Sequence, residues 1–182
     1  MGNILLGLVP ALMWGLQPLV MQKIGGKATN QQMGMSMGAL LFSIGVMIFH
    51  RPDAWGMNLI IASLLCGVVW SFGQINQIKS FHIIGVSRAM PISTGTQLIG
   101  TSLVGVLYFH EWTRTMQFVL GISALVLFIL GVSLTAFQEQ AEEVSGKVNM
   151  KKGVIILLMS SAAFVLYAVI PRVAGINGWD AV

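Results

Sequence analysis

The sequence predicts an all-α integral membrane protein with about six transmembrane helices. Two observations lead to this prediction: the chain has few charged residues, and long uncharged runs separate them. Hydrophobic residues make up 55% of the chain and charged residues 9%, and the mean hydropathy is +0.82. A soluble domain carries about 25% charged residues. The deficit leaves too little polar surface to face water, so lipid must cover much of the protein.

The uncharged runs have the length of membrane-spanning helices. Each contains 19 to 25 residues and ends at Lys, Arg, Asp or Glu. A helix needs about 20 apolar residues to cross the hydrocarbon core, and it satisfies its own backbone groups there. The alternating segments of about 10 residues that a membrane β-barrel requires are absent. The runs are residues 1–22, 28–50, 54–78, 89–110, 115–138 and 153–171.

Each run accounts for one helix in order along the chain. The first contains Pro10 and Pro18, and the second carries Gly34 and Gly38 at a spacing typical of close helix packing. The third is the longest run, and the fourth contains Pro91, which we expect to break its helix. The fifth and sixth lie on either side of a charged segment. We expect helices near residues 3–22, 31–49, 57–78, 85–108, 116–137 and 153–171.

The charged segment divides the chain into two unequal parts. We expect residues 1–137 to form a first five-helix repeat, residues 138–152 a linker, and residues 153–182 the truncated start of a second repeat. A shift of the sequence by 149 positions sets Gln22–Gly26 against Pro171–Gly175 and overlays helix one on helix six. Repeats with an odd number of spans are inverted relative to one another, which is a transporter architecture. The sequence therefore predicts the N-terminal part of a ten-helix transporter.

The basic residues predict the orientation in the membrane. Cytoplasmic loops carry an excess of Lys and Arg. Six basic residues fall in loops on one side and three on the other, which places the amino terminus outside and the linker in the cytoplasm. The first group is Lys23, Lys27, Lys79, Lys147, Lys151 and Lys152, and the second is Arg51, Arg114 and Arg172.

Neutral polar side chains alternate with tryptophan in two of the predicted helices. Trp70, Gln74 and Gln77 share one face of helix three because they are spaced four and three residues apart. Helix one repeats the pattern with Trp14 and Gln17. Amides both donate and accept hydrogen bonds, and an indole offers a flat apolar face to the C–H groups of a sugar ring. These residue types suit a neutral, polyhydroxylated solute better than an ion.

Helix four adds further candidates. Thr94 and Gln97 are polar residues within the span, where polar groups are costly unless they face a cavity or a partner helix. Arg88 lies near the start of this helix, and Glu111 at its end is the acid nearest to a pathway. We regard both charged residues as candidates for coupling or gating.

Structural roles compete with these functional ones. Serine and threonine in membrane helices often bond to their own backbone or to a neighbouring helix. Tryptophans usually lie in interfacial belts. Arg88 could extend to lipid headgroups, and Glu111 could be a packing partner at the interface. The sequence leaves these alternatives open.

The sequence contains no motif for catalysis and predicts neither a cofactor nor a metal site. It lacks a Walker loop, an HExxH motif, a nucleophile elbow and a glycine-rich dinucleotide fingerprint. Cys66 is the single cysteine, which excludes an internal disulfide and a multi-cysteine metal site. The net charge of +4 is spread over short loops and relates to topology, so we expect no nucleic-acid partner.

Several segments resemble a known family. The chain is similar along its whole length to the glucose/ribose uptake permeases, which belong to the drug/metabolite transporter superfamily of bacteria. The stretch within helix four is the most specific part of this resemblance. The matching segments are Pro10–Gly15, Gly25–Lys27, Gly73–Gln77, Ile84–Leu98 and Glu111-Trp112.

The resemblance implies a secondary transporter of ten helices in two inverted repeats. It would import a neutral sugar into bacteria through the cell membrane, by proton symport and alternating access, and glucose is favoured by Asn76-Gln77 and Ser93-Thr94-Gly95. Its partners would be the sugar, protons and membrane lipid, and a homo-oligomer is left open. The alternatives are a ribose permease, a drug or metabolite exporter of the same superfamily, and a membrane fragment without transport activity. The implied sugar contacts are Trp14, Gln17, Trp70, Gln74, Gln77, Thr94 and Gln97, with Arg88 and Glu111 in coupling or gating.

Overall fold

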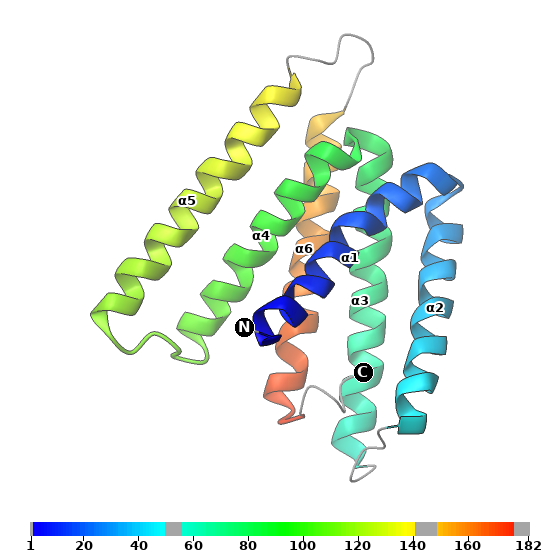
Figure 1. The fold of residues 1–182 in the computed structure, drawn as a ribbon, viewed down its shortest axis with the longest axis horizontal. Helices are drawn as coiled ribbons and strands as arrows, with labels where there is room; N and C mark the ends of the chain where they lie inside the picture. Colours follow the sequence, from blue (N-terminus) through cyan, green and yellow to red (C-terminus); the bar gives the residue numbers. More distant parts are fainter. Residues whose placement is uncertain (1, 50–55, 141–148, 177–182) are drawn as a thin grey trace.

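Six helices account for all the secondary structure that the computed structural model describes, which covers residues 2–49, 56–140 and 149–176. This confirms the predicted all-helical class. The helix ends agree with the predicted ones to within three residues except in α3, which continues six residues past Ile78. The helices are α1 (Gly2–Ile24), α2 (Ala28–Phe49), α3 (Met57–Ile84), α4 (Val86–Leu107), α5 (Thr115–Gln140) and α6 (Met150–Val173) (Figure 1).

Successive helices run in opposite directions. The ends of α1, α3 and α5 lie at the same end of the bundle as the starts of α2, α4 and α6 (Figure 1). The turn from α3 to α4 is a single residue, Gly85, which caps both helices at φ 83° and ψ 154°. Only glycine adopts this backbone region readily. Gly85 therefore lets α4 return directly along α3.

Four of the described helices are long and apolar enough to cross a membrane. They are α2, α3, residues 115–134 of α5, and α6. The predicted count of about six spans is therefore supported for four helices. α4 is less apolar because it contains Arg88 together with several hydroxyl and amide side chains.

Pro91 does not break α4, contrary to our expectation. The helix runs without interruption from Val86 to Leu107. Pro91 lies in the second turn, where its missing N–H removes a single intrahelical hydrogen bond.

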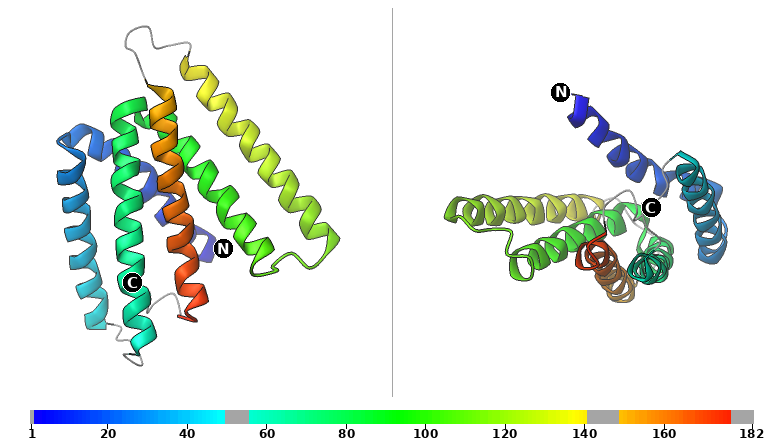
Figure 2. Two further views of the ribbon diagram at one scale, coloured as in Figure 1. Left: turned by 180° about the vertical axis from the view of Figure 1, so that it is seen from behind. Right: turned by 90° about the horizontal axis from the view of Figure 1, so that it is seen from below.

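The sixth helix is the centre of the packing. α6 lies between α3 and α4 and makes its largest contacts with these two helices, whereas α5 packs on α4 and α2 on α3 (Figure 2). α1 crosses the bundle obliquely and contacts α4 only slightly. A buried cluster of Ile84, Ala89 and Leu157 joins the α3–α4 turn to α6.

Glycines allow α6 to approach its neighbours closely. A Cβ atom at Gly100 of α4 would lie 2.6 Å from Cγ2 of Val165, and a Cβ atom at Gly153 of α6 would overlap the side chain of Ile84. Small residues at such crossings are typical of helix packing in membranes. By contrast, large apolar side chains on α1, α2 and α5 point outward, as expected for surfaces that face lipid.

Candidate functional site

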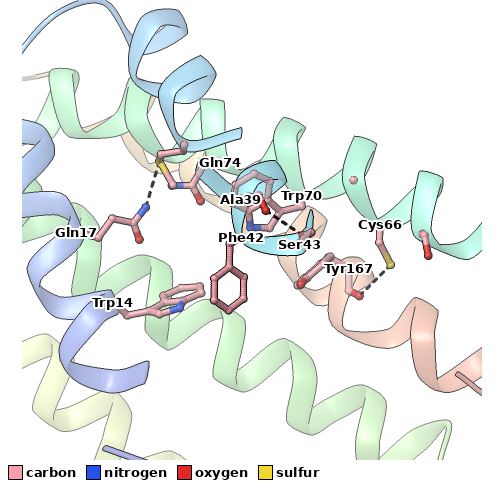
Figure 3. Close-up of a pocket in the computed structure, with 12 residues that line it drawn as sticks. Trp14, Gln17, Ala39, Phe42, Ser43, Cys66, Trp70, Gln74 and Tyr167 are labelled. Carbon is pink, nitrogen blue, oxygen red and sulfur yellow. Dashed lines mark hydrogen bonds between the residues drawn. The ribbon is translucent and has the colours of Figure 1, made fainter. Parts of the chain in front are cut away.

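A cavity of about 640 Å³ lies between α1, α2, α3 and α6. Its volume is in the range of small-molecule sites, about 300–1,000 Å³. Figure 3 shows Gln17 and Gln74 at one end of the cavity and Cys66 and Tyr167 at the other. Trp14 of α1 and Phe42 of α2 also line the cavity (Figure 3). The cavity thus has an amide end and a tyrosine end.

One face of α3, which we call the α3 stripe, forms the longest wall of the cavity. Its lining residues recur at three- and four-residue intervals, which places them on one helical face. α1 contributes two residues three apart, and α2 contributes residues on one face in the same way. The α3 residues are Ser63, Cys66, Gly67, Trp70 and Gln74; those of α1 are Trp14 and Gln17, and those of α2 are Met35, Ala39, Phe42 and Ser43.

The two glutamines at the amide end donate to thioether sulfurs, and Gln17 Nε2 also lies 3.9 Å from Met21 Sδ. Gln17 Nε2 donates to Met35 Sδ at 3.2 Å, and Gln74 Nε2 donates to the same sulfur at 3.6 Å. A thioether is a poor hydrogen-bond acceptor. Gln74 is nevertheless buried, with 4% of its surface exposed. A ligand hydroxyl would therefore be a better partner for both amides than the sulfur that they now share.

Aromatic rings provide flat apolar walls close to these amides. Trp70 lies on the α3 stripe, four residues before Gln74. Trp14 lies three residues before Gln17 on α1. The structure brings these four predicted residues together at one cavity, although the sequence separates the two pairs by more than 50 positions. Paired amides and indoles can bind hydroxyl groups on a ring whose C–H faces are apolar.

The remaining predicted polar contacts of α3 and α4 meet elsewhere. Gln77 Nε2 and Gln97 Nε2 both donate to Ser93 Oγ, each at 2.8 Å. Gln77 is 4% exposed and Ser93 is fully buried. Thr94 is exposed and, like Gln77 and Gln97, does not line the cavity. In this structure the three residues belong to helix contacts or the outer surface.

The contact of α6 with α3 and α4 continues this set of hydrogen bonds. Ser160 Oγ donates to the carbonyl of Gly73 at 2.6 Å, and Ser80 Oγ donates to the carbonyl of Gly153 at 3.1 Å. The hydroxyls of Thr96 and Ser161 lie 2.6 Å apart. We call the whole set the polar seam: Ser80, Gln77, Ser93, Thr96, Gln97, Ser160 and Ser161, with the carbonyls of Gly73 and Gly153.

The two predicted charged residues also lie away from the lining of the cavity. Arg88 is buried in the first turn of α4, with 8% of its surface exposed. Glu111 Oε1 accepts a hydrogen bond from Arg172 Nη1 at 2.6 Å, and the Arg172 guanidinium lies 4.0 Å from the ring centre of Phe109. Both ion-pair side chains are about half exposed. This contact ties the α4–α5 connection to the end of α6.

The sequence analysis did not identify several lining residues. Continuing the α3 stripe from Trp70 toward the N-terminus would have reached Cys66 after one helical turn and Ser63 after two, so periodicity contained that signal. Tyr167 of α6 could not be found in this way, because it lies about 90 residues beyond the rest of the stripe. Within the described ranges, no group of three His, Cys, Asp or Glu side chains is placed to hold a metal ion.

Comparisons with known proteins identify the family to which the chain belongs. The chain is 53% identical over 180 residues to "Putative sugar uptake protein lmo0169" of Listeria monocytogenes, a match that covers 99% of this chain and 62% of that protein. It is 41% identical over 180 residues to "Glucose uptake protein GlcU" of Bacillus subtilis, with 98% and 62% covered. No solved structure matches the chain.

The chain spans less than two thirds of the length of these relatives. A family described as "Sugar transport protein" matches residues 5–182, which is nearly the whole sequence. On this match and these identities, the chain belongs to the sugar transport protein family.

Proposed function

We propose that this chain forms part of a secondary transporter that imports a neutral sugar across the bacterial cell membrane, and that the cavity is its sugar site. One observation above all supports the site: the amide groups of Gln17 and Gln74 both donate to the weak acceptor Met35 Sδ, in a cavity also lined by Trp14 and Trp70. Sugar hydroxyls would replace the sulfur as partners, and the indoles would cover the apolar faces of the ring.

Glucose is the proposed substrate. The relative from Bacillus subtilis is named "Glucose uptake protein GlcU". A relative from Priestia megaterium, named "Probable glucose uptake protein GlcU", is 42% identical to this chain over 181 residues. The match covers 63% of the length of the Priestia megaterium protein. Because the chain covers only part of either relative, the assignment of glucose is our inference for the complete transporter. The lining residues are neutral, which favours a neutral cargo over a cation.

The proposed mechanism is alternating access between two inverted five-helix repeats. α1–α5 would be the first repeat and α6 the first helix of the second, separated by the charged linker. The polar seam and close glycine contacts support α6 as the element through which the second repeat acts on the first. Movement of α6 relative to α1 and α2 would change access to the cavity, because Tyr167 of α6 lines it.

Proton symport is part of the same proposal. Of the acids whose side chains are described, Glu111 is the candidate for coupling, because its protonation would remove the charge that holds Arg172. The ion pair lies at the end of α6, so its loss would free this helix end to move. Arg88, buried at the other end of α4, would position that end of the helix.

The test is uptake of labelled glucose by cells or proteoliposomes that contain the protein. We expect saturable uptake above background and better competition by unlabelled glucose than by ribose. Gln17→Leu should raise the half-saturation constant, while Gln22→Leu, an exposed glutamine of the same helix outside this cavity, should leave it unchanged. If ribose competes better than glucose, ribose becomes the proposed substrate. If neither sugar is taken up, the proposed import is refuted.

A further inference from the structure

We propose that Tyr167 determines which sugars are accepted, because its hydroxyl binds the hydroxymethyl group of a hexose at the tyrosine end of the cavity. This inference rests on the proposed function and adds to it a residue from the helix that follows the linker. Tyr167 is the lining residue from α6, and Figure 3 shows it opposite Gln17 and Gln74.

The two ends of the cavity are too far apart for one group of residues to hold the whole sugar. Cys66 and Gln74 are eight residues apart on α3, which corresponds to about 12 Å along a helix. The amides of Gln17 and Gln74 can therefore bind hydroxyls at one end only. A polar group of the sugar that reaches the other end needs a second partner there.

The chemistry of the two ends differs in a way that orients a hexose. Two amides offer paired donors and acceptors, which suits adjacent hydroxyls on the ring. The other end presents single hydroxyls instead of amides: the phenol of Tyr167, with the hydroxyls of Ser63 and Ser43 in the same lining, and Ser43 Oγ donates to the carbonyl of Ala39 at 2.9 Å (Figure 3). A hydroxymethyl group has a single hydroxyl on an apolar carbon, so it fits this end better than a pair of ring hydroxyls does.

The Tyr167 hydroxyl is available for this contact. Within the described part of the chain it makes no hydrogen bond, and the contact that holds Tyr167 in place is from Cys66 Sγ to its backbone carbonyl, at 3.9 Å. The Tyr167 side chain is 39% exposed, so a ligand can reach its hydroxyl. A site that hydrogen-bonds a substrate hydroxyl discriminates against analogues that lack it. 6-Deoxyglucose lacks the hydroxymethyl hydroxyl of glucose, and the pyranose form of ribose lacks the whole hydroxymethyl group.

The experiment compares Tyr167→Phe with the unmodified protein, using glucose, 6-deoxyglucose and ribose as competitors of labelled glucose uptake. We expect the half-saturation or inhibition constant for glucose to rise about 2- to 10-fold, as for one lost hydrogen bond. The constants for 6-deoxyglucose and ribose should stay unchanged, because neither sugar uses the deleted hydroxyl. The preference for glucose over 6-deoxyglucose should fall by the same factor.

Two control variants separate this effect from general damage. Tyr108→Phe removes a hydroxyl from an exposed tyrosine next to Phe109, outside the cavity, and should alter none of the three constants. Gln74→Leu should weaken glucose and 6-deoxyglucose equally, since it acts at the amide end. The amount of each variant in the membrane is measured alongside.

The inference would be wrong if Tyr167→Phe changed all three constants by the same factor, or changed none of them. Either result would leave the proposed sugar uptake intact, because uptake of glucose by the unmodified protein is measured in the same assay. Failure of the unmodified protein to take up sugar would instead refute the proposed function, and the inference with it.

Discussion

The polar seam and the cavity are built from the same kinds of side chain but differ in how well their hydrogen bonds are satisfied. α3 supplies both, since Gln74 faces the cavity and Gln77 the seam, three residues apart. Gln77 has a hydroxyl acceptor at 2.8 Å, whereas Gln74 has a thioether at 3.6 Å. Satisfied amides hold helices together, and poorly satisfied amides remain available to a ligand.

The two regions also differ in how closely the helices approach. In the seam, Ser93 and Ser160 are fully buried and glycines lie directly against side chains of the next helix. Along the cavity, Gly67 has no atom within 4 Å of where its Cβ would be. Substitutions in the seam should therefore affect stability, and substitutions along the cavity should affect binding.

The largest expected effect is that of Gly153→Ala. The new Cβ would overlap the buried side chain of Ile84, which cannot move away because it lies in the core cluster. Overpacking of this kind costs about 1–3 kcal/mol, and we expect the upper end of the range. Thermal unfolding in detergent measures it.

The matched control for Gly153→Ala is Gly45→Ala, at a position with open space around the new Cβ. It should be neutral or slightly stabilising, because alanine is the better helix former. Equal unfolding temperatures for the two variants would show that the seam is not closely packed.

A smaller effect is expected for Gln77→Leu. This change deletes the hydrogen bond to Ser93 within a buried contact, and we expect a loss of about 1–2 kcal/mol of stability. The half-saturation constant of the molecules that fold should stay unchanged. A normal unfolding temperature together with weaker sugar uptake would show that Gln77 acts in sugar binding and not in helix packing.

Gln74→Leu should give the opposite result from Gln77→Leu. It leaves the seam intact and removes only a weak bond to Met35, so stability should hardly change. Loss of a sugar hydrogen bond of about 0.5–1.5 kcal/mol raises the half-saturation constant about 2- to 10-fold. Concentration-dependent uptake measures this constant, and a large drop in stability with unchanged affinity would contradict the division between the two regions.

A small effect on stability is also expected at the ion pair of Glu111 and Arg172. Both side chains are about half exposed, and exposed pairs contribute about 0–1 kcal/mol. A double-mutant cycle with Glu111→Gln and Arg172→Gln should give a coupling energy in this range that falls with added salt. A coupling energy of several kcal/mol would place the pair among the structural contacts of the seam.

Function at this ion pair is tested separately from stability. If Glu111 couples sugar to protons, Glu111→Gln should still exchange sugar across the membrane but lose accumulation driven by a pH gradient. Accumulation that survives in this variant would exclude Glu111 from coupling.

Composition and helical periodicity predicted the helices and four of the residues that line the cavity, Trp14, Gln17, Trp70 and Gln74. Charges interrupt the chain at intervals set by membrane thickness, so the helix positions follow from composition along the chain. The stripe from Trp70 to Gln74 follows from the 3.6-residue repeat of a helix, which acts within one segment. The end of α3 lies beyond its predicted position because the helix continues past Lys79, whereas a rule based on uncharged runs stops at the first charge.

Only the tertiary structure decided which helix faces meet. In the folded chain Gln74 lines the cavity, whereas Gln77 belongs to the polar seam. Tyr167 of α6 lines the same cavity as the α3 stripe, and Glu111 pairs with Arg172. In a membrane every helix is apolar on most sides, so hydropathy does not distinguish one neighbour from another. The choice depends on where glycine and serine permit close approach and on which hydroxyl meets which amide, and these contacts join residues far apart in the sequence.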